Sequence, residues 1–597
     1  MIIQEIQQAA AEAVQSEFGV EIDPGILPIQ ETRKDFEGDF TIVVFPLTKL
    51  RLGNPQQIGE RIGAVLTEKL EAVESYNVIK GFLNLSLSSS FWRTFMAENH
   101  DNSAFFKLDH GTGKTVVVEY CSPNTNKPLH LGHLRNITLG YAVTEILKAN
   151  GYEVHPTCLF NDRGTNISKS MFAWMEKGKN DSPEELGIKG DKFVGNYYVE
   201  FARKMADEAA AEIASGVPKQ KAEANTPSMK AVHDMTVKWE EGDAEIRNLW
   251  EKMNGWVYEA FHQTFERLGV SFERFYYESQ VYQRGKETVE EGLEKGIFTT
   301  TEDGSVEIDL TDDGMDKKTL LRSNGTSLYV TQDLAIAEDK FNEFHMDKSI
   351  YVVGNEQDYH FKVLFKILQK LGKTYGEGLF HLSYGMVDLP TGKMKSREGT
   401  TVDADDLMDD MEQTAREETQ KNPDRVEGMS DEELNELAKI VGIGALKYYL
   451  AKVDPKKRML FDPNESIDLK GNTGPFIQYS YTRTQAVKRK SEGVDIPEYD
   501  AKMIPEEELL DSERVLLKLL FKYADVLKEA GEGYNPALIA NYAYELAKEY
   551  NRFYHEAKIL RSDFPKTSAF RFALSGWVGE ALKEAMGLLG IGMPSRM

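Results

Sequence analysis

The chain has 597 residues, with 97 acidic and 71 basic side chains and a formal net charge of −26. A single hydrophobic core does not grow to this size, so we expect about three or four domains. No stretch of about 18 apolar residues occurs, so no membrane span is predicted. Two cysteines, Cys121 and Cys158, exclude a disulfide scaffold and a cysteine-rich zinc site. The N-terminus lacks the features of a signal peptide, and a soluble cytoplasmic protein is expected.

The negative charge argues against a nucleic-acid partner, because such binding depends on Lys and Arg contacts to phosphate. The acidic residues are unevenly distributed, however, and are dense over residues 403–436. Basic residues gather at 456–458 and at 488–490. Since local fields decide binding, we predict a surface with strong charge asymmetry.

Residues 1–105 predict a small α+β domain at the start of the chain. A leading helix is followed by short strands around residues 40–45, a helix near 55–73 and a strand at 81–88. The polar and turn-rich residues 99–113 are expected to form a linker.

Residues 112–455 predict an α/β domain with a parallel sheet. Residues 116–118 are consecutive valines, as expected for a strand that is buried on both faces. An insertion over about residues 177–255 is charged and helical, and its sequence shows no chemistry. The predicted strands are residues 115–120, 152–160, 349–353 and 380–385.

A segment suited to a polyphosphate follows the first of these strands. Residues 122–133 have the sequence SPNTNKPLHLGH, and a helical pattern begins between the two histidines. A helix N-terminus after a sheet strand offers free N–H groups and a positive dipole end. His130 and His133 lie on the same side of the first turn, where both can donate hydrogen bonds to phosphate oxygens. Gly132 would let a nucleotide approach the backbone, and Lys127 adds a charge.

Two histidines three residues apart are also compatible with a surface helix or with a metal site. Metal binding is disfavoured, because zinc normally requires a further protein ligand and none lies nearby at a familiar spacing. No metal site is therefore predicted.

Residues 456–597 predict an all-α helical bundle. Just before it, Ser430 and Glu433 have the spacing of a capping box that opens a helix. The helices predicted in the last third of the chain are residues 512–530, 536–560 and 567–589.

Six segments, in this order along the chain, resemble the arginyl-tRNA synthetase family of class I aminoacyl-tRNA synthetases. They are VEYCSPNTNKPLHLGHLRN, LFNDRGTNI, SLYVTQDLA, GNEQDYHF, GKMKSREGTTV and GNTGPFIQYSYTR. Within them, HLGH is similar to the class I "HIGH" signature, and KMKSR, residues 393–397, is similar to the "KMSKS" loop. The likeness covers nearly the whole chain, from EGDF at residues 37–40 to the C-terminal LLGIGMPSRM. It implies a Rossmann-like catalytic domain with an N-terminal tRNA-binding domain and a C-terminal anticodon-binding domain.

The loop departs from the family pattern at Ser396, where lysine is usual. Members with this change typically carry a lysine just before the HIGH signature, and Lys127 occupies that place. The resemblance thus implies that Lys127, His130 and His133 stabilise charge on the transferring phosphates. Further charge would come from the loop residues Lys393, Lys395 or Arg397. The implied ATP-binding residues are His130, Gly132, His133, Met386, Lys393 and Ser396.

A pocket for arginine requires carboxylates that face the guanidinium. Tyr329 and Asp333 are four residues apart and share a face if their segment is helical. Taken alone, Asp333 could equally start a helix, and Tyr329 could be a core aromatic. The resemblance implies that Asp333 and Glu278 hold the guanidinium. The implied arginine-binding residues are Glu119, Asn124, Glu278, Tyr329, Asp333 and Gln357.

Interleaved aromatic and polar residues in the C-terminal bundle suit splayed RNA bases. They occupy residues 478–483 and 550–555, and about half of the aromatics are expected to be buried in helix packing. The implied tRNA-binding residues are Tyr479, Arg483, Asn551, Arg552, Tyr554 and Met597.

The resemblance implies a monomer that ligates L-arginine to tRNA(Arg) through arginyl-adenylate. It would use ATP with Mg²⁺, with neither zinc nor an organic cofactor, and would require tRNA for efficient activation. A different ATP-dependent adenylyltransferase is an alternative, but many such enzymes are shorter and lack the helical C-terminal domain. A non-enzymatic RNA-binding paralogue would be expected to lose the histidine pair or the pocket acids, all of which are present.

Overall fold

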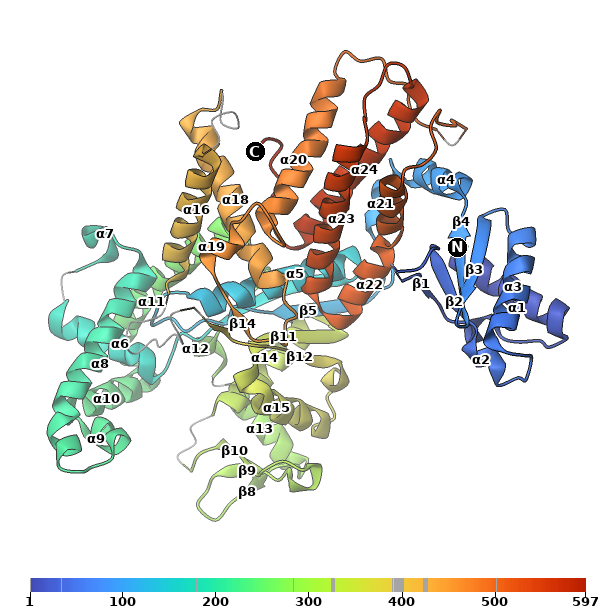
Figure 1. Cartoon of the computed structure of the whole chain (residues 1–597). Coiled ribbons are helices and arrows are strands. Elements are labelled where there is room, and N and C mark those ends of the chain that lie inside the picture. The colour runs from blue at the N-terminus through green and yellow to red at the C-terminus, as the bar shows by residue number, and fades with distance from the viewer. Residues whose placement is uncertain are drawn as a thin grey trace. The chain divides into compact units, whose positions relative to one another are not determined.

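The computed structural model of the chain (Figure 1) divides into two compact units. The first comprises Met1–Phe105, Thr484–Lys522 and Lys548–Glu580, and the second comprises Phe106–Arg483, Tyr523–Ala547 and Ala581–Met597. The structure describes residues 2–33, 35–178, 181–282, 284–323, 328–388, 390, 402–421, 428–500 and 502–597.

A four-stranded antiparallel sheet in the order β1-β2-β4-β3 opens the first unit. The predicted strands around 40–45 and 81–88 and the helix near 55–73 are confirmed, whereas β1 and β3 were not predicted. Lys80 and Gly81 join β3 to β4, and both have positive φ, as in the tight turns that suit a twisted hairpin. The elements are α1 (Ile2–Phe18), β1 (Ile29–Glu31), β2 (Phe40–Val43), α3 (Pro55–Lys69), β3 (Val73–Ile79), β4 (Phe82–Leu87) and α4 (Ser89–Asn99).

The C-terminal part of the chain is helical, and one predicted helix is wrong in detail. The expected continuous helix over residues 512–530 is interrupted at Lys522. Phe521 packs against Trp92 in the first unit, whereas Tyr523 packs against Phe106 in the second, so the chain turns between two aromatic anchors. The helices are α20 (Gly474–Ser491), α21 (Asp511–Phe521), α22 (Tyr523–Gly533), α23 (Pro536–Glu556) and α24 (Pro565–Leu588).

The second unit is built on a five-stranded sheet in the order β12-β11-β5-β6-β7, with every neighbouring pair parallel. Val116 and Val118 of β5 belong to one hydrophobic cluster and Val117 to another, so this strand is buried on both faces as predicted. The fold class is thereby confirmed, and four of the five strands were predicted. The strands are β5 (Thr115–Glu119), β6 (Glu153–Phe160), β7 (Arg274–Tyr277), β11 (Lys348–Gly354) and β12 (Leu379–Tyr384).

Helices connect and cover these strands. From β5 the chain proceeds to β6 and β7 on one side, and β11 and β12 lie on the other. The boundary between β5 and β11 is therefore a topological switch point, where open α/β sheets bind ligands. The helices that matter for the site are α5 (Leu131–Ala149), α12 (Glu278–Val281), α14 (Tyr329–Phe344), α15 (Asp358–Lys370), α16 (Ala404–Gln420) and α18 (Asp431–Ala451).

The predicted insertion is helical (teal in Figure 1). The predicted capping box before α18 is confirmed, with Ser430 and Glu433 exchanging bonds of 3.2 and 2.8 Å. A small antiparallel sheet of β8 (Thr299–Thr300), β9 (Val306–Ile308) and β10 (Lys318–Leu321) was not predicted. Among the described residues, no helix is long and apolar enough to span a bilayer. The insertion comprises α7 (Pro183–Leu186), α8 (Gly190–Ala214), α9 (Lys219–Asn225), α10 (Pro227–Glu241) and the start of α11 (Ala244–Arg267).

A buried ion pair fastens α24 to α21 in the first unit. Arg571 Nε donates to Glu513 Oε1 at 2.6 Å, and the two side chains are only 3% and 2% exposed. Glu513 also accepts from the Leu510 N–H at 2.8 Å, and Arg571 makes a second ion pair with Glu507. Burial raises the pKa of Glu513 even so, which means that its charge depends on the guanidinium.

We expect Arg571→Met to lower the free energy of unfolding by about 3–5 kcal/mol, because it leaves Glu513 buried without a cation. Adding Glu513→Gln should restore most of the loss, since Gln still accepts from Leu510 and carries no charge. The exposed pair Lys439–Glu436 is the control, and Lys439→Met should change stability by less than about 0.5 kcal/mol. Urea denaturation measures the free energy of unfolding of the Arg571→Met variant, the double variant and the Lys439→Met control. Equal losses for Arg571→Met and Lys439→Met would contradict this reading of the buried pair.

Candidate active site

The candidate site lies at the carboxyl end of β5, where residues 121–130 lead into α5. The loop is fastened to the segment after β6. Thr125 N–H donates to the Asn161 carbonyl at 3.2 Å, and Asn161 N–H donates to the Pro123 carbonyl at 3.0 Å. Asn124 forms an isolated bridge with Asn161, and its side chain is exposed. Asn124, which is predicted to bind the α-amino end of arginine, is therefore solvent-exposed within this loop.

The two histidines cap the helix. His130 is the N-cap residue, and its Nδ1 accepts from the Gly132 N–H at 3.1 Å. His133 Nδ1 accepts from the His130 N–H, also at 3.1 Å. The rings are close, with centroids 3.9 Å apart and planes tilted by 34°. Since each Nδ1 is an acceptor, each neutral ring carries its proton on Nε2 and can donate from there.

Burial keeps both rings neutral. It lowers the pKa of His130 to about 4, helped by the nearby Lys127, and it lowers the pKa of His133 well below the usual value. Burial also lowers the pKa of Lys127. The histidines are therefore hydrogen-bond donors at neutral pH rather than cations, and Lys127 is the charged group beside them.

Gly132 lies close to the His130 ring. A Cβ at this position would lie 3.0 Å from His130 Cε1 and 3.1 Å from its Nδ1, a tight contact that the ring would have to relieve by a small shift. The glycine therefore makes room for the capping imidazole, and its predicted role toward a nucleotide stays a prediction.

The predicted KMKSR loop, with Lys393, Lys395, Ser396 and Arg397, lies outside the described residues. The chain before it forms β13 (Val387–Asp388), which pairs with β14 (Met459–Leu460). The chain after it bonds to the histidine segment, through Leu131 N–H to the Val402 carbonyl at 3.3 Å and Ala404 N–H to the Leu129 carbonyl at 2.9 Å.

Met386, a predicted ATP-binding residue, lines a cavity of about 400 Å³ next to β13. Asn355, Glu356, Lys456 and Arg458 also line it. The predicted basic cluster at 456–458 therefore contributes two cations to the surroundings of this residue.

Arg135 holds the turn before β14 in place. It is fully buried, and its Nη2 donates to the Pro455 carbonyl at 3.2 Å and the Lys457 carbonyl at 2.9 Å. Burial lowers its pKa to about 10, so the guanidinium remains charged at neutral pH. The second turn of α5 thus fixes the turn that carries Lys456 and Lys457.

The predicted arginine-binding carboxylates lie on neighbouring helices. Asp333 of α14 bonds His360 Nε2 of α15 at 2.6 Å. Glu278, the first residue of α12, is buried and has a raised pKa of about 7. The cause is burial, opposed by Arg163, with Asp162 and Asp333 as neighbouring negative charges. Two acids therefore face one region without an equal number of cations.

The other predicted pocket residues differ in accessibility. Tyr329 is 75% exposed at the first turn of α14, and Gln357 is exposed before α15. Glu119 is buried and pairs with the buried Lys340 at 2.5 Å. Its charge is already neutralised within the protein, which makes it the weakest of the six candidates.

Asp162 is a functional candidate that the sequence analysis missed. It is fully buried, its Oδ1 accepts from the Ser279 N–H at 2.8 Å, and its Oδ2 accepts from the Ser279 and Tyr258 hydroxyls at 2.6 and 2.7 Å. It thereby fixes the residue next to Glu278. The sequence signal was LFNDRG, an acid just beyond a predicted strand.

The predicted tRNA-binding residues fall into two sets, one in each unit. In the second unit Tyr479 and Arg483 are half-buried and form a cation–π pair at 4.8 Å, and Met597 packs partly against the core. In the first unit Arg552 is exposed and pairs with Glu556, while Asn551 and Tyr554 are half-buried. Tyr481, Tyr550 and Phe553 are buried, which agrees with the expectation that about half of the aromatics pack in the bundle.

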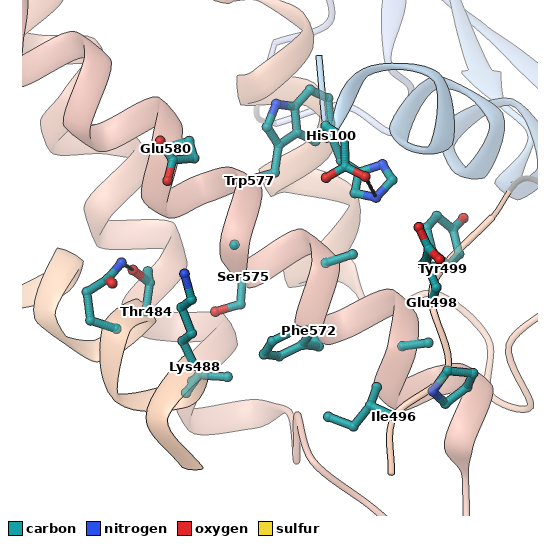
Figure 2. Close-up of a pocket in the computed structure, with 17 residues that line it drawn as sticks. His100, Thr484, Lys488, Ile496, Glu498, Tyr499, Phe572, Ser575, Trp577 and Glu580 are labelled. Atoms are coloured by element: carbon teal, nitrogen blue, oxygen red, sulfur yellow. Dashed lines mark hydrogen bonds and ion pairs between the residues drawn. The ribbon is translucent and has the colours of Figure 1, made fainter. Parts of the chain in front are cut away.

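A separate cavity of about 430 Å³ lies within the first unit (Figure 2). Thr484 and Lys488 of α20, Trp577 of α24 and the segment around Tyr499 line it. Its acids, Asp101, Glu498 and Glu580, outnumber Lys488, so it has no excess of positive charge. It contains none of the predicted site residues.

The class of protein follows from comparison with known families. Residues 99–461 match the family described as tRNA synthetases class I (R), catalytic domain, and residues 477–597 match the DALR anticodon binding domain. Together these describe a class I aminoacyl-tRNA synthetase.

The relatives define the family. The chain is 50% identical to an arginine–tRNA ligase of Bacteroides thetaiotaomicron over 97% of both chains. It is 48% identical to that of Parabacteroides distasonis over 100% of both. The Thermus thermophilus arginyl-tRNA synthetase has the same fold, with a TM-score of 0.77 and 24% identity over 100% of both chains. The chain belongs to the arginyl-tRNA synthetase family.

The raised pKa of Glu278 predicts a pH dependence for arginine binding. If Glu278 binds the guanidinium, as the sequence predicts, its protonation removes a charge that favours binding, whereas the ligand itself stays charged, so affinity should fall as pH falls. With a pKa of about 7, the ionised fraction drops about tenfold between pH 8 and pH 6, and arginine should bind up to about tenfold more weakly. Calorimetric titration at several pH values measures this. Glu278→Gln should bind weakly at every pH and flatten the profile, and unchanged affinity of the original chain at pH 6 would refute the assignment.

Proposed function

We infer that the chain is an arginine–tRNA ligase, which activates L-arginine with ATP and then transfers it to the 3′-terminal ribose of tRNA(Arg). The observation that carries this inference is the full-length likeness to arginine–tRNA ligases at 50% identity. The meeting of a capped helix N-terminus and an acidic pocket at one edge of the sheet supports it.

In the first step the arginine carboxylate attacks the α-phosphate of ATP, and pyrophosphate leaves. No protein nucleophile is needed, so catalysis consists of orientation and of stabilising charge on the phosphate oxygens. His130 and His133 donate from Nε2, and Lys127 supplies charge. Lys393, Lys395 or Arg397 of the KMKSR loop add further charge, and magnesium enters bound to ATP.

Arginine binds with its guanidinium between Glu278 and Asp333, beside Tyr329. Asn124 and Gln357 bind its α-amino and carboxyl end. The guanidinium presents planar, forked donors that match two carboxylates, whereas the ammonium of lysine is a compact point charge. An amino acid that leaves the carboxylates of this site unpaired is rejected strongly, so no editing step is required.

The tRNA binds through the helical C-terminal region, with Tyr479, Arg483, Asn551, Arg552 and Tyr554 contacting bases and backbone. Met597 at the C-terminus contributes an apolar contact. We propose that the protein acts as a cytoplasmic monomer.

Pyrophosphate exchange with each amino acid, with and without tRNA, tests the function. Exchange should depend on arginine and be strongest with tRNA(Arg). Exchange that depends on lysine or glutamine instead would overturn both the function and the pocket.

Replacing Lys127 with Ala should slow arginine activation by about a hundredfold, because the transferring phosphates lose a charged partner in a poorly solvated site. Lys204→Ala is the matched control, since Lys204 pairs with Glu176 on the insertion surface. Its exchange rate should equal that of the original chain. A Lys127→Ala enzyme that is as fast as the control would show that the loop cations suffice.

A further inference from the structure

The helical insertion contacts both the histidine segment and the start of α16 through one helix end. The sequence assigned the insertion no chemistry, and none of its residues is among the predicted site residues. Its helix α8, however, lies against the histidine segment and against the first turn of α16, which directly follows the KMKSR loop.

The first contact is the close packing of the α8 backbone against the loop that carries Lys127. A Cβ on Gly195 of α8 would lie 2.8 Å from Pro128 Cδ and 3.5 Å from Lys127 Cα. Real Cβ atoms essentially never approach another heavy atom to 2.8 Å, and Pro128 is a rigid ring, so any side chain here must displace the loop that carries Lys127. Glycine at this helix position costs helix stability and is explained by the close packing.

The second contact is electrostatic. Lys189, the N-cap residue of α8, pairs with Asp405 of α16 at 2.6 Å, and both side chains are about four-fifths buried. One turn on, Lys192 bonds both oxygens of Asp406 at 3.0 and 3.1 Å. Arg267 at the end of α11 adds bonds to Asp409 and Glu412. Two cations of the insertion helix α8 and one at the end of α11 therefore fasten α16 to these helices.

The histidine segment and the start of α16, which α8 contacts separately, are also bonded to each other. Residues 402–404 pair with residues 129–131, through backbone bonds on both sides of the bridge between His130 and Asp403. Asp403 also caps α16, accepting from the Asp405 N–H at 2.8 Å. Helix α8, the histidine segment and the start of α16 therefore each contact the other two.

We propose that Gly195 and Lys189 of the insertion are positioning residues for arginine activation, which hold Lys127 and the first turn of α16 in place beside the histidine pair. This inference rests on the proposed function. The insertion then serves as a brace between the loop that carries Lys127 and the start of α16, which is bonded to the histidine segment. A displacement of about 1 Å at such a site is enough for a large loss of rate.

A purely structural role would give a different result. Helix α8 also packs against α11, where a Cβ on Gly190 would lie 2.1 Å from the Trp256 carbonyl oxygen, and against α6 (Thr165–Lys177). Loss of those contacts would lower stability and all activities together. Loss of the brace should lower the rate of activation while arginine affinity stays the same, because Glu278 and Asp333 belong to other elements.

The first test compares Gly195→Ala with Gly255→Ala on the neighbouring helix α11, where a Cβ would meet nothing within 4 Å. In tRNA-dependent pyrophosphate exchange, Gly195→Ala should lower kcat by about ten- to a hundredfold, with calorimetric arginine affinity within about twofold of the original chain. Gly255→Ala should match the original chain. Equal kcat for both variants would overturn the proposal, and inactivity of the original chain would instead overturn the proposed function.

The second test replaces a charge and does not depend on how well Gly195→Ala folds. Lys189→Met should lower kcat about tenfold, and Lys189→Arg, which keeps the cation, should restore most of it. Lys204→Met, on the same helix and also removing an ion pair, is the control and should leave kcat unchanged. If Lys189→Met and Lys204→Met have the same kcat, or if Lys189→Arg is as slow as Lys189→Met at an unchanged melting temperature, the brace is refuted.

Discussion

The nucleotide side of the site depends on how the first turn of α5 satisfies its amides. A helix N-terminus exposes N–H groups that need acceptors, and Ser, Thr, Asp or Asn usually provide them. Here two imidazoles do so through Nδ1. A serine or aspartate cap has no second donor at its far side. A histidine cap orients its ring through Nδ1 and leaves Nε2 as a donor, so one ring can cap the helix and still bond a ligand.

Because the two imidazole rings are neutral, positive charge at this site must come from other residues. Because burial keeps His130 and His133 uncharged, only Lys127 among the described residues of that wall adds a full charge. The same burial reduces screening by water, so each remaining charge acts more strongly on a phosphate. Arg135 is charged too, but its Nη2 is committed to backbone carbonyls. It contributes geometry, by fixing the turn before β14, rather than charge at the ligand.

The sheet could be predicted because its strands have a simple signature. The valines of β5 are buried on both faces, and Thr157 to Phe160 at the end of β6 are buried as well. The strand β7 has four residues, RFYY, and is only partly buried, so neither length nor apolar content separates it from a loop. Ion pairs between residues far apart in the sequence could not be predicted for a different reason. Glu119 and Lys340 are 221 residues apart, and no local pattern shows that a buried lysine already neutralises a candidate ligand.

The proposed arginine pocket shows how specificity can rest on few residues. Asp333 is bonded by His360, and burial raises the pKa of Glu278 to about 7, with Asp162 and Asp333 as neighbouring negative charges. Acids that repel one another in a poorly solvated site are unfavourable until a cation arrives. A guanidinium relieves this repulsion and supplies enough donors for both acids, whereas an ammonium relieves the charge but matches the planar geometry less well. In the proposed pocket, discrimination would come from these unfavourable carboxylates, and Asp162 supports their arrangement by fixing Ser279 next to Glu278.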